Sequence, residues 1–354
     1  MATNNSVNIK KTVADLLKNI SARNKDIISR RFGLKSGQKE TLESIGSSYS
    51  ITRERVRQIE ESTLSQLRQA VTGHTDVKRY IVLARDILNE HGGVIKESDL
   101  FKSFSGSDTD NVINGSLVFL LTLSNEVSRF VENDDFNSFW AVNNATLASF
   151  VSTTDSLIKI LQKAGRVVSN SDFMFLAQKH AVPSFSTSGK PLSEGDINVV
   201  MAISKNLGSN IFNEVGLASW SEIKPKGVRD KAYLVLKKST KPQHFSDIAS
   251  LINTSGFHKK KANVQTVHNE LIKDNRFILV GRGMYALSEW GYTAGTVKDV
   301  LVSVLRTSGK PLTKAILMSK VKDARMVKEN TILLNLQDSK TFIKNTDGTY
   351  TLKK

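Results

Sequence analysis

The clearest pattern of apolar and polar positions lies between Thr41 and Leu67, where two short helices joined by a turn are predicted. In the second helix, residues that can be buried recur at steps of three, four and four, which places them on one stripe: Val56, Ile59, Thr63 and Leu67. Thr52 precedes this helix as a candidate N-cap, because its hydroxyl can accept from an amide of the first turn. The segment therefore predicts a helix-turn-helix.

The polar face of the second helix carries two rows of side chains. Arg53 and Arg57 form one row at a spacing of four, and Glu54 and Gln58 form the other. Arginine can donate to guanine, glutamate can accept from cytosine and glutamine can bond adenine, so these side chains suit readout of the DNA major groove. A solvated charged helix face has a similar composition, so the pattern leaves both interpretations open.

Four further stretches share one order of patterns and begin about 70 to 75 residues apart. In each, an apolar helical stretch runs into a turn-forming residue and a short extended piece; these helices are expected at 81–90, 156–163, 231–238 and 297–306. Extended residues end the four repeats, at 129–132 with 139–142, 210–212 with 217–220, 276–287, and 341–352. Turn residues at 280–284 and 345–349 favour tight hairpins. Each repeat thus predicts a helix, a strand, two helices and a β-hairpin wing.

The expected fold is mainly α with small β wings (α+β), built from several domains. An all-α helix-turn-helix domain at 1–75 is followed by four winged-helix-like domains, at 76–150, 151–225, 226–293 and 294–354. One tryptophan falls near the end of each of the first three repeats, and these side chains are expected to fill cores: Trp140, Trp220 and Trp290.

Charge is distributed unevenly along the 354 residues. The chain has 50 Lys and Arg against 34 Asp and Glu, a formal net charge of +16. Counted by segment, 1–79 carries +7, 80–150 carries −6, 151–225 carries +1 and 226–354 carries +14. Two basic ends around an acidic to neutral middle indicate two nucleic-acid contacts joined by a spacer or a protein-binding section. Charge that merely confers solubility would explain the total but not this division.

Several classes of site lack the residues that they need. There is no cysteine, and the six histidines are scattered without the spacing of a zinc site. A phosphate-binding loop at Gly309-Lys310 would need a glycine where Val304 stands. No apolar run approaches the ~18 residues of a membrane span, and the first residues are not a signal peptide. We therefore expect a cytoplasmic, nucleoid-associated protein that is not an enzyme, with no metal, cofactor, small-molecule substrate or membrane partner.

The segments 21–34 and 41–60, with Leu64, Leu67 and Arg68, closely resemble region 4 of the primary, sigma-70-type bacterial transcription initiation factors. The resemblance implies that Arg53, Glu54 and Gln58 read bases of a −35-like promoter element. It also implies that Thr52, Arg55 and Arg57 hold the phosphate backbone. The chain departs from the family at Ser50, where a turn glycine is usual; if that position needs a positive φ, Ser50 is modestly strained.

The same resemblance implies a protein partner. In this family the module docks on the flap of the RNA polymerase β subunit, so core RNA polymerase is an expected partner beside double-stranded DNA. The resemblance covers roughly residues 10–70, so about ten residues precede it, whereas the family places its promoter-melting region ahead of region 4. We therefore expect that region to be missing and the protein to be unable to open a promoter alone.

Residues 241–292 resemble a second family, the HARE-type winged helix-turn-helix, through the sequences at 244–249, 266–272 and 276–290. That family includes the amino-terminal domain of the polymerase δ subunit and modules fused to DNA-modifying enzymes. Lys259, Lys260 and Lys261 precede the helix expected at 264–272 and could contact phosphates, and so could Arg282, which two glycines flank at a hairpin tip. A solvated basic loop and an Arg that only decorates a turn are the alternatives.

The sequence as a whole indicates a non-enzymatic, DNA-binding transcription protein that recognises a −35-like element, docks on RNA polymerase, or does both. One alternative is a δ-like accessory protein, which binds polymerase and DNA without reading sequence. A recogniser of modified or foreign DNA is a third interpretation, suggested by the HARE resemblance alone.

Overall fold

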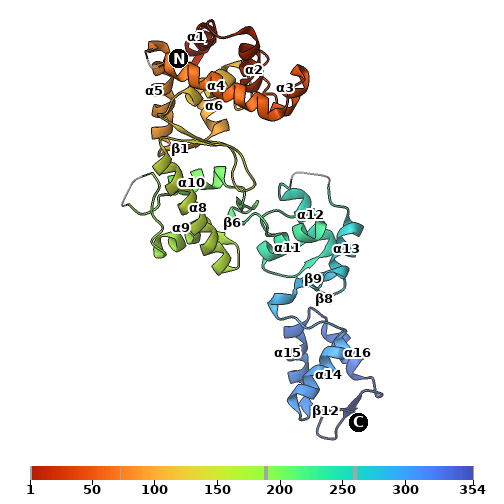
Figure 1. Cartoon of the computed structure of the whole chain (residues 1–354). Helices are drawn as coiled ribbons and strands as arrows, with labels where there is room; N and C mark the ends of the chain where they lie inside the picture. Colours follow the sequence, from red (N-terminus) through yellow and green to blue (C-terminus); the bar gives the residue numbers. More distant parts are fainter. Residues whose placement is uncertain (1, 72, 187–189, 258–260, 354) are drawn as a thin grey trace. The chain divides into compact units, whose positions relative to one another are not determined.

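The computed structural model describes residues 2–71, 73–186, 190–257 and 261–353. It divides into two compact units (Figure 1). The first comprises Met1–Gly208 with Glu214–Ala218, and the second comprises Ser209–Asn213 with Ser219–Lys354.

The first unit begins with an all-α part, as predicted. Its helices are α1 (Ala2–Leu16), α2 (Ala22–Phe32), α3 (Leu42–Tyr49) and α4 (Arg53–Val71). The short α3 and the longer α4 form the expected helix-turn-helix and pack against each other. Together with Ile27 of α2, the facing side chains Ile45 and Val56 form a small buried cluster of their own.

The first two repeats complete the first unit. Repeat one contains α5 (Thr75–Glu90), β1 (Val94–Lys96), α6 (Glu97–Ser105), α7 (Val112–Leu123), β2 (Ser128–Phe130) and β3 (Phe139–Ala141). Repeat two contains α8 (Asn144–Ala164), β4 (Val168–Ser169), α9 (Asn170–Lys179), α10 (Glu194–Ile203), β5 (Leu207–Ser209) and β6 (Glu214–Leu217). The sheet orders are β1-β3-β2 and β4-β6-β5.

The other two repeats form most of the second unit. Repeat three contains α11 (Val228–Ser239), β7 (Gln243–His244), α12 (Phe245–Thr254), α13 (Val264–Lys273), β8 (Phe277–Gly281), β9 (Met284–Leu287) and the 3-10 helix η1 (Ser288–Trp290). Repeat four contains α14 (Val297–Ser308), β10 (Leu312–Thr313), α15 (Lys314–Ala324), α16 (Glu329–Leu336), β11 (Phe342–Lys344) and β12 (Thr349–Leu352). Their sheets have the orders β7-β9-β8 and β10-β12-β11.

All four repeats thus show the predicted order of helix, strand, two helices and hairpin, and the fold is mainly α with small antiparallel β wings. The hairpin of repeat two is placed differently from the prediction. Its strands end before Asn210 and Ala218, because Asn210 makes a turn: its Oδ1 accepts from the Phe212 N–H at 2.9 Å, and its carbonyl oxygen accepts from the Asn213 N–H at 3.0 Å. Trp220 therefore lies beyond the sheet and is half-buried, whereas Trp140 fills a core with 1% of its surface exposed.

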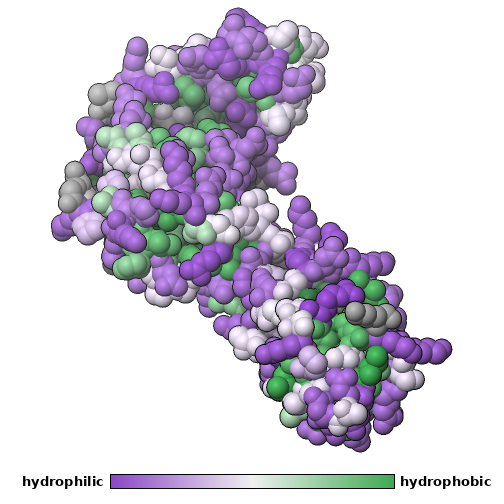
Figure 2. Space-filling model, turned by 90° about the horizontal axis from the view of Figure 1, so that it is seen from below, coloured by the Kyte–Doolittle hydropathy of each residue, from purple (hydrophilic) through white to green (hydrophobic). Residues whose placement is uncertain are grey.

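Most of the face seen in Figure 2 is hydrophilic, and apolar residues appear there as smaller areas. No helix within the described ranges is both long and apolar enough to cross a membrane.

One hydrophobic core joins the helix-turn-helix part to repeat one. Buried side chains of α1, α2 and α4 belong to the same cluster as those of α5, α6, α7 and Trp140. Helix α7 is buried almost all round, and its Phe119 meets Phe32 of α2 edge to face at 5.3 Å between ring centres. Gly115 permits this contact, because a Cβ there would lie 2.2 Å from the Phe32 carbonyl oxygen.

The repeats of the second unit also contact each other through backbone. The segment after α15 reaches the outer edge of β8, where the Met326 N–H donates to the Val280 carbonyl oxygen at 3.0 Å. The Arg325 guanidinium donates to the Leu279 carbonyl oxygen at 2.9 Å. Arg325 is only 6% exposed, and burial lowers the pKa of its guanidinium. Repeats three and four are therefore held together at the edge of a sheet.

The close contact at Gly115 yields a stability prediction. Gly115→Ala should destabilise the first unit by about 1–3 kcal/mol, because the new methyl group meets a backbone carbonyl that can move only with its helix. Hydrogen exchange of the α2 and α7 amides, followed by mass spectrometry, measures the change.

Gly195→Ala is the matched control, because Gly195 also lies in a helix of the first unit and its added Cβ would meet only Ser193 Oγ at 3.6 Å. This replacement should be neutral or stabilise by up to ~1 kcal/mol through helix propensity. Equal protection in the two variants would contradict the packing described for α7.

Candidate nucleic-acid interface

The turn between α3 and α4 is tight, and local interactions fix it. Thr41 caps α3, since its Oγ1 accepts from the Ser44 N–H at 3.1 Å. Ser50 then takes a left-handed conformation with φ of 53°, so the position where the family usually has glycine does need a positive φ. A Cβ on Gly46 would lie 2.7 Å from the Ile51 carbonyl oxygen. Gly46 therefore lets the chain pass close behind α3 on its way to α4.

Helix α4 begins where its polar face begins. Thr52 Oγ1 accepts from the Arg55 N–H at 3.2 Å, which confirms the predicted cap. Val56, Thr63 and Leu67 are buried and Ile59 is half-buried, as the period of the sequence predicts. Because this stripe packs inward, the opposite face of the first two turns points to solvent.

The structure brings the sequence-predicted residues of α4 together on that solvent face. Arg53, Glu54, Arg55, Arg57 and Gln58 are all exposed. Arg57 makes a bidentate pair with Glu54, from Nε to Oε2 at 3.0 Å and from Nη2 to Oε1 at 2.8 Å. Arg55 Nη1 donates to Gln58 Oε1 at 3.1 Å. Each of these two acceptors therefore has a neighbouring arginine as its donor.

The ion pair perturbs both of its members. The hydrogen bonds from Arg57 lower the pKa of the Glu54 carboxyl, and the same bonds raise the pKa of Arg57. Glu54 is thus ionised over a wider pH range than an isolated glutamate, and the pair is lost as the pH falls through the lowered pKa. Arg57 Nη1 also donates to Glu61 Oε2 at 2.9 Å, one turn further along α4. At neutral pH three arginine charges therefore lie beside the two carboxylate charges of Glu54 and Glu61.

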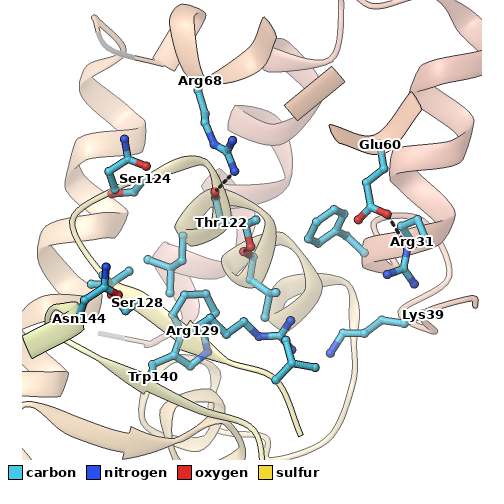
Figure 3. Close-up of a pocket in the computed structure, with 16 residues that line it drawn as sticks. Arg31, Lys39, Glu60, Arg68, Thr122, Ser124, Ser128, Arg129, Trp140 and Asn144 are labelled. Carbon is cyan, nitrogen blue, oxygen red and sulfur yellow. Dashed lines mark hydrogen bonds and ion pairs between the residues drawn. The ribbon is translucent and has the colours of Figure 1, made fainter. Parts of the chain in front are cut away.

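Two arginines of α2 hold the helix-turn-helix from behind. Arg30 makes a bidentate contact with Glu40, at 2.8 and 2.6 Å, just before α3. Arg31 donates to Glu60 Oε2 of α4 at 3.1 Å and to the Glu40 carbonyl oxygen at 2.6 Å. These contacts were not foreseen from the sequence, although both arginines lie in the segment that resembles region 4. They connect α2 to the residue just before α3 and to the middle of α4, and so orient α4. Figure 3 shows the contact between Arg31 and Glu60, which lies at one side of a pocket in the first unit.

The remaining predicted phosphate contacts lie in repeat three. Lys259 and Lys260 fall outside the described residues, and Lys261 is exposed ahead of α13. Arg282 is exposed in the turn between β8 and β9, as expected for a hairpin tip. Gly283 has a φ of 69°, and a Cβ at this position would lie 2.4 Å from His244 Nε2. The absence of a side chain at Gly283 therefore lets the hairpin tip pack against the His244 ring. Repeat three belongs to the second unit, whereas α4 belongs to the first.

The described residues include no group of three or more His, Asp or Glu side chains placed to hold a metal ion.

The Glu54 carboxyl provides a test of the geometry of the polar face. In an NMR titration of its side-chain carboxyl, Glu54 should titrate below the ordinary pKa of glutamate, because Arg57 stabilises its charged form. Arg57→Gln should raise the pKa towards the ordinary value. Arg85→Gln, which removes an exposed arginine of α5 paired with Glu126 instead, should leave Glu54 unchanged. An ordinary pKa for Glu54 in the unmodified protein would show that the pair does not form in solution.

Comparison with known proteins finds similarity over the part of the chain that contains this site. Residues 16–69 match the family model for Sigma-70, region 4. The RNA polymerase sigma factor SigA of Microcystis aeruginosa is 37% identical over 73 residues, which are 21% of this chain and 17% of that protein. The same figures hold for SigA of Synechocystis sp.. SigA of a Bacillus species is 40% identical over 60 residues, 17% of this chain and 16% of that protein.

The chain thus spans about a sixth of the length of the curated relatives that it matches. The resemblance inferred from the motifs at 21–34 and 41–60 is confirmed, whereas the HARE-type resemblance of 241–292 stays a prediction. The N-terminal helix-turn-helix of this chain, with its exposed face on α4, is similar to region 4 of sigma-70-type factors.

Proposed function

We propose that this protein is a sigma-like, DNA-binding transcription protein whose helix α4 reads a −35-like promoter element. The observation that carries the proposal is the exposed face of α4, which gathers arginine, glutamate and glutamine side chains on a capped helix. The similarity of residues 16–69 to sigma-70 region 4 supports it independently. In a helix-turn-helix, the first residues of the second helix meet base edges.

The side chains suit distinct roles on a duplex. Arg53 would donate to O6 and N7 of a guanine, and Gln58 would bond N6 and N7 of an adenine. Arg57 would leave Glu54 and Glu61 for a backbone phosphate, which lets the Glu54 carboxylate accept from a cytosine amino group. Arg55 would likewise exchange Gln58 for a phosphate, and Thr52 can donate its hydroxyl hydrogen while it caps α4. Both arginine pairs would thus be replaced by contacts with DNA.

The second unit would add affinity that does not depend on sequence. The segment 226–354 carries +14, so its lysines and arginines release counterions when they approach phosphates. Lys261 and Arg282, with Lys259 and Lys260, are the proposed contacts of repeat three. Core RNA polymerase, through its β flap, is the proposed protein partner of the region-4-like part, because the relatives matched there are named RNA polymerase sigma factors.

A δ-like polymerase accessory protein with nonspecific DNA binding is the second candidate. The charge of the second unit favours it, because this surplus attracts any duplex equally. The two candidates differ in whether the face of α4 selects a sequence.

Selection of bound duplexes from a random library distinguishes the candidates. The full chain is used, with and without core RNA polymerase, at one stated salt concentration. We expect a TTGACA-like motif to be enriched. An unselective pool together with stable polymerase binding would contradict promoter reading and support the accessory role.

Variants then assign the contacts. Arg53→Ala and Gln58→Ala should each weaken binding to the selected duplex by about 1–3 kcal/mol and relax the preference at one position, as loss of a base contact does. Lys261→Gln should weaken all duplexes alike and reduce the salt slope by about 1. Arg85→Ala, in α5, is the control and should change neither quantity. Equal losses on selected and scrambled duplexes for Arg53→Ala would rule out base reading by that side chain.

A further inference from the structure

The junction of repeats three and four lies at the outer edge of β8, where the extended segment 325–328 between α15 and α16 reaches this strand. Strand β8 is at the edge of its sheet, whose order is β7-β9-β8. The Met326 N–H donates to the Val280 carbonyl oxygen at 3.0 Å, as a neighbouring strand would. Among the described residues, this is the one backbone hydrogen bond between the segment and β8. The junction thus uses little of what an edge strand can offer.

The two backbones approach most closely at Gly281, the last residue of β8. A Cβ at Gly281 would lie 2.9 Å from the Met326 carbonyl oxygen, so the contact requires a residue without a side chain. Arg282 follows Gly281 directly and is exposed in the hairpin turn. The junction and the proposed phosphate contact at Arg282 are therefore adjacent along the backbone.

The charged side chain at this junction, Arg325, has few partners. It is 6% exposed, and its Nη2 donates to the Leu279 carbonyl oxygen at 2.9 Å. Its Nε and Nη1 are buried and have no hydrogen-bond partner among the residues that the structure describes. Most of the N–H donors of the guanidinium are therefore unused.

The acid that acts on Arg325 compensates its charge only in part. Asp299, in the first turn of α14, attracts the guanidinium. Its Oδ2 already accepts from the Thr296 N–H and from the Thr296 hydroxyl, both at 2.7 Å, and the side chain is exposed to solvent. A buried cation with so few acceptors opposes the contact that buries it. Release of Arg325 from the junction would remove this penalty.

We propose that Arg325 is a phosphate contact of the second unit that is buried at the edge of β8 in the free protein and is released when a DNA duplex binds at Arg282. The released guanidinium would donate to two phosphate oxygens in place of one carbonyl oxygen. The exposed Lys328 lies on the same segment and would approach the phosphates with it. This inference rests on the general DNA affinity proposed for the second unit, and it makes that affinity depend on opening of the junction.

A purely structural role for Arg325 predicts a different response to mutation. If the guanidinium held the repeats together, an apolar side chain of similar length would loosen the junction. Replacement of a buried, poorly paired cation by an apolar residue is instead neutral or stabilising. Because DNA would favour the released form, a change that stabilises the docked form must also weaken DNA binding. The effect of Arg325→Met on the junction therefore separates the two roles.

Hydrogen exchange of the Met326 amide reports the junction directly, because this N–H is the donor to Val280. It is followed by mass spectrometry of overlapping peptides from the full chain without DNA. Gly281→Ala should make exchange about tenfold faster, as expected when a backbone hydrogen bond is lost, because the new methyl group displaces the Met326 carbonyl. Arg325→Met should leave exchange equal or slower. Faster exchange in Arg325→Met would show that the guanidinium stabilises the junction and would overturn the proposal.

Two matched variants serve as controls for this measurement. Gly227→Ala also adds a methyl group in the second unit, but its Cβ would meet nothing within 4 Å. Arg306→Met removes an exposed arginine near the end of α14. Both should leave exchange of the Met326 amide unchanged. Equal exchange in Gly281→Ala and Gly227→Ala would contradict the contact described at β8.

A duplex without a TTGACA-like motif is then added at saturating concentration and one stated salt concentration. In the unmodified chain, exchange of the Met326 amide should become about tenfold faster on the duplex, while the α11 amides in the core of repeat three stay protected. Arg325→Met should bind the duplex about five- to tenfold more weakly and reduce the salt slope by about 1. Gly281→Ala should bind about two- to fivefold more tightly, because its junction is already open.

The outcomes separate this inference from the function on which it rests. Binding of the duplex with an unchanged, protected Met326 amide would overturn release of Arg325 and leave the general affinity of the second unit intact. Equal losses of affinity in Arg325→Met and Arg306→Met would show that Arg325 acts through its charge alone, and would overturn its transfer to a phosphate. Failure of the full chain to bind the duplex would overturn both the release and the general affinity.

Discussion

The close contact between the backbones of α7 and α2 is the constraint on which the rest of the first unit depends. A Cβ at Gly115 would force the two helices apart, because the Phe32 carbonyl oxygen would lie 2.2 Å from it. This contact lets an almost wholly apolar helix of repeat one pack on the inner faces of α2 and α4. The helix-turn-helix is therefore part of a larger body, and the direction of the α4 polar face is fixed relative to repeat one.

Local features of the site could be predicted from the sequence, because local rules determine them. The stripe of Val56, Thr63 and Leu67 and the cap at Thr52 both follow from residues within a few positions of one another. The hairpin at Arg282 follows from its flanking glycines in the same way. The four repeats could be predicted for a related reason: the same local patterns follow one another in the same order in each of them. The positive φ at Ser50 was indicated instead by the family resemblance, since the family usually has a turn glycine at that position.

Long-range packing could not be predicted in this way. Helix α7 is apolar on every side, so it has no period that indicates which element it covers, and the shared core was therefore missed. The network around Glu97 joins Lys39, Arg129 and Trp140 across as many as 58 positions of sequence, and no spacing rule connects them. In repeat two, Asn210 looked like part of an extended segment, but its side chain accepts from the backbone and makes a turn.

The proposed DNA contacts of α4 and of the second unit differ in how far their electrostatic gain depends on the DNA sequence. On α4, exposed arginines are paired with Glu54 and Gln58, so binding DNA exchanges one set of hydrogen bonds for another and the choice of base decides the net gain. In the second unit, the surplus of +14 over 226–354 acts on any phosphate backbone. Sequence preference and general affinity would thus reside in different parts of the chain.

Replacement of guanine N7 in the major groove tests the central claim, that α4 reads base edges, most directly. Binding of the full chain is compared on two TTGACA duplexes at one salt concentration, one of which carries 7-deazaguanine in place of the guanine. Base reading by Arg53 predicts weaker binding to the modified duplex, and no difference between the two duplexes for Arg53→Ala. Equal binding of both duplexes by the unmodified protein would contradict reading of that guanine by α4.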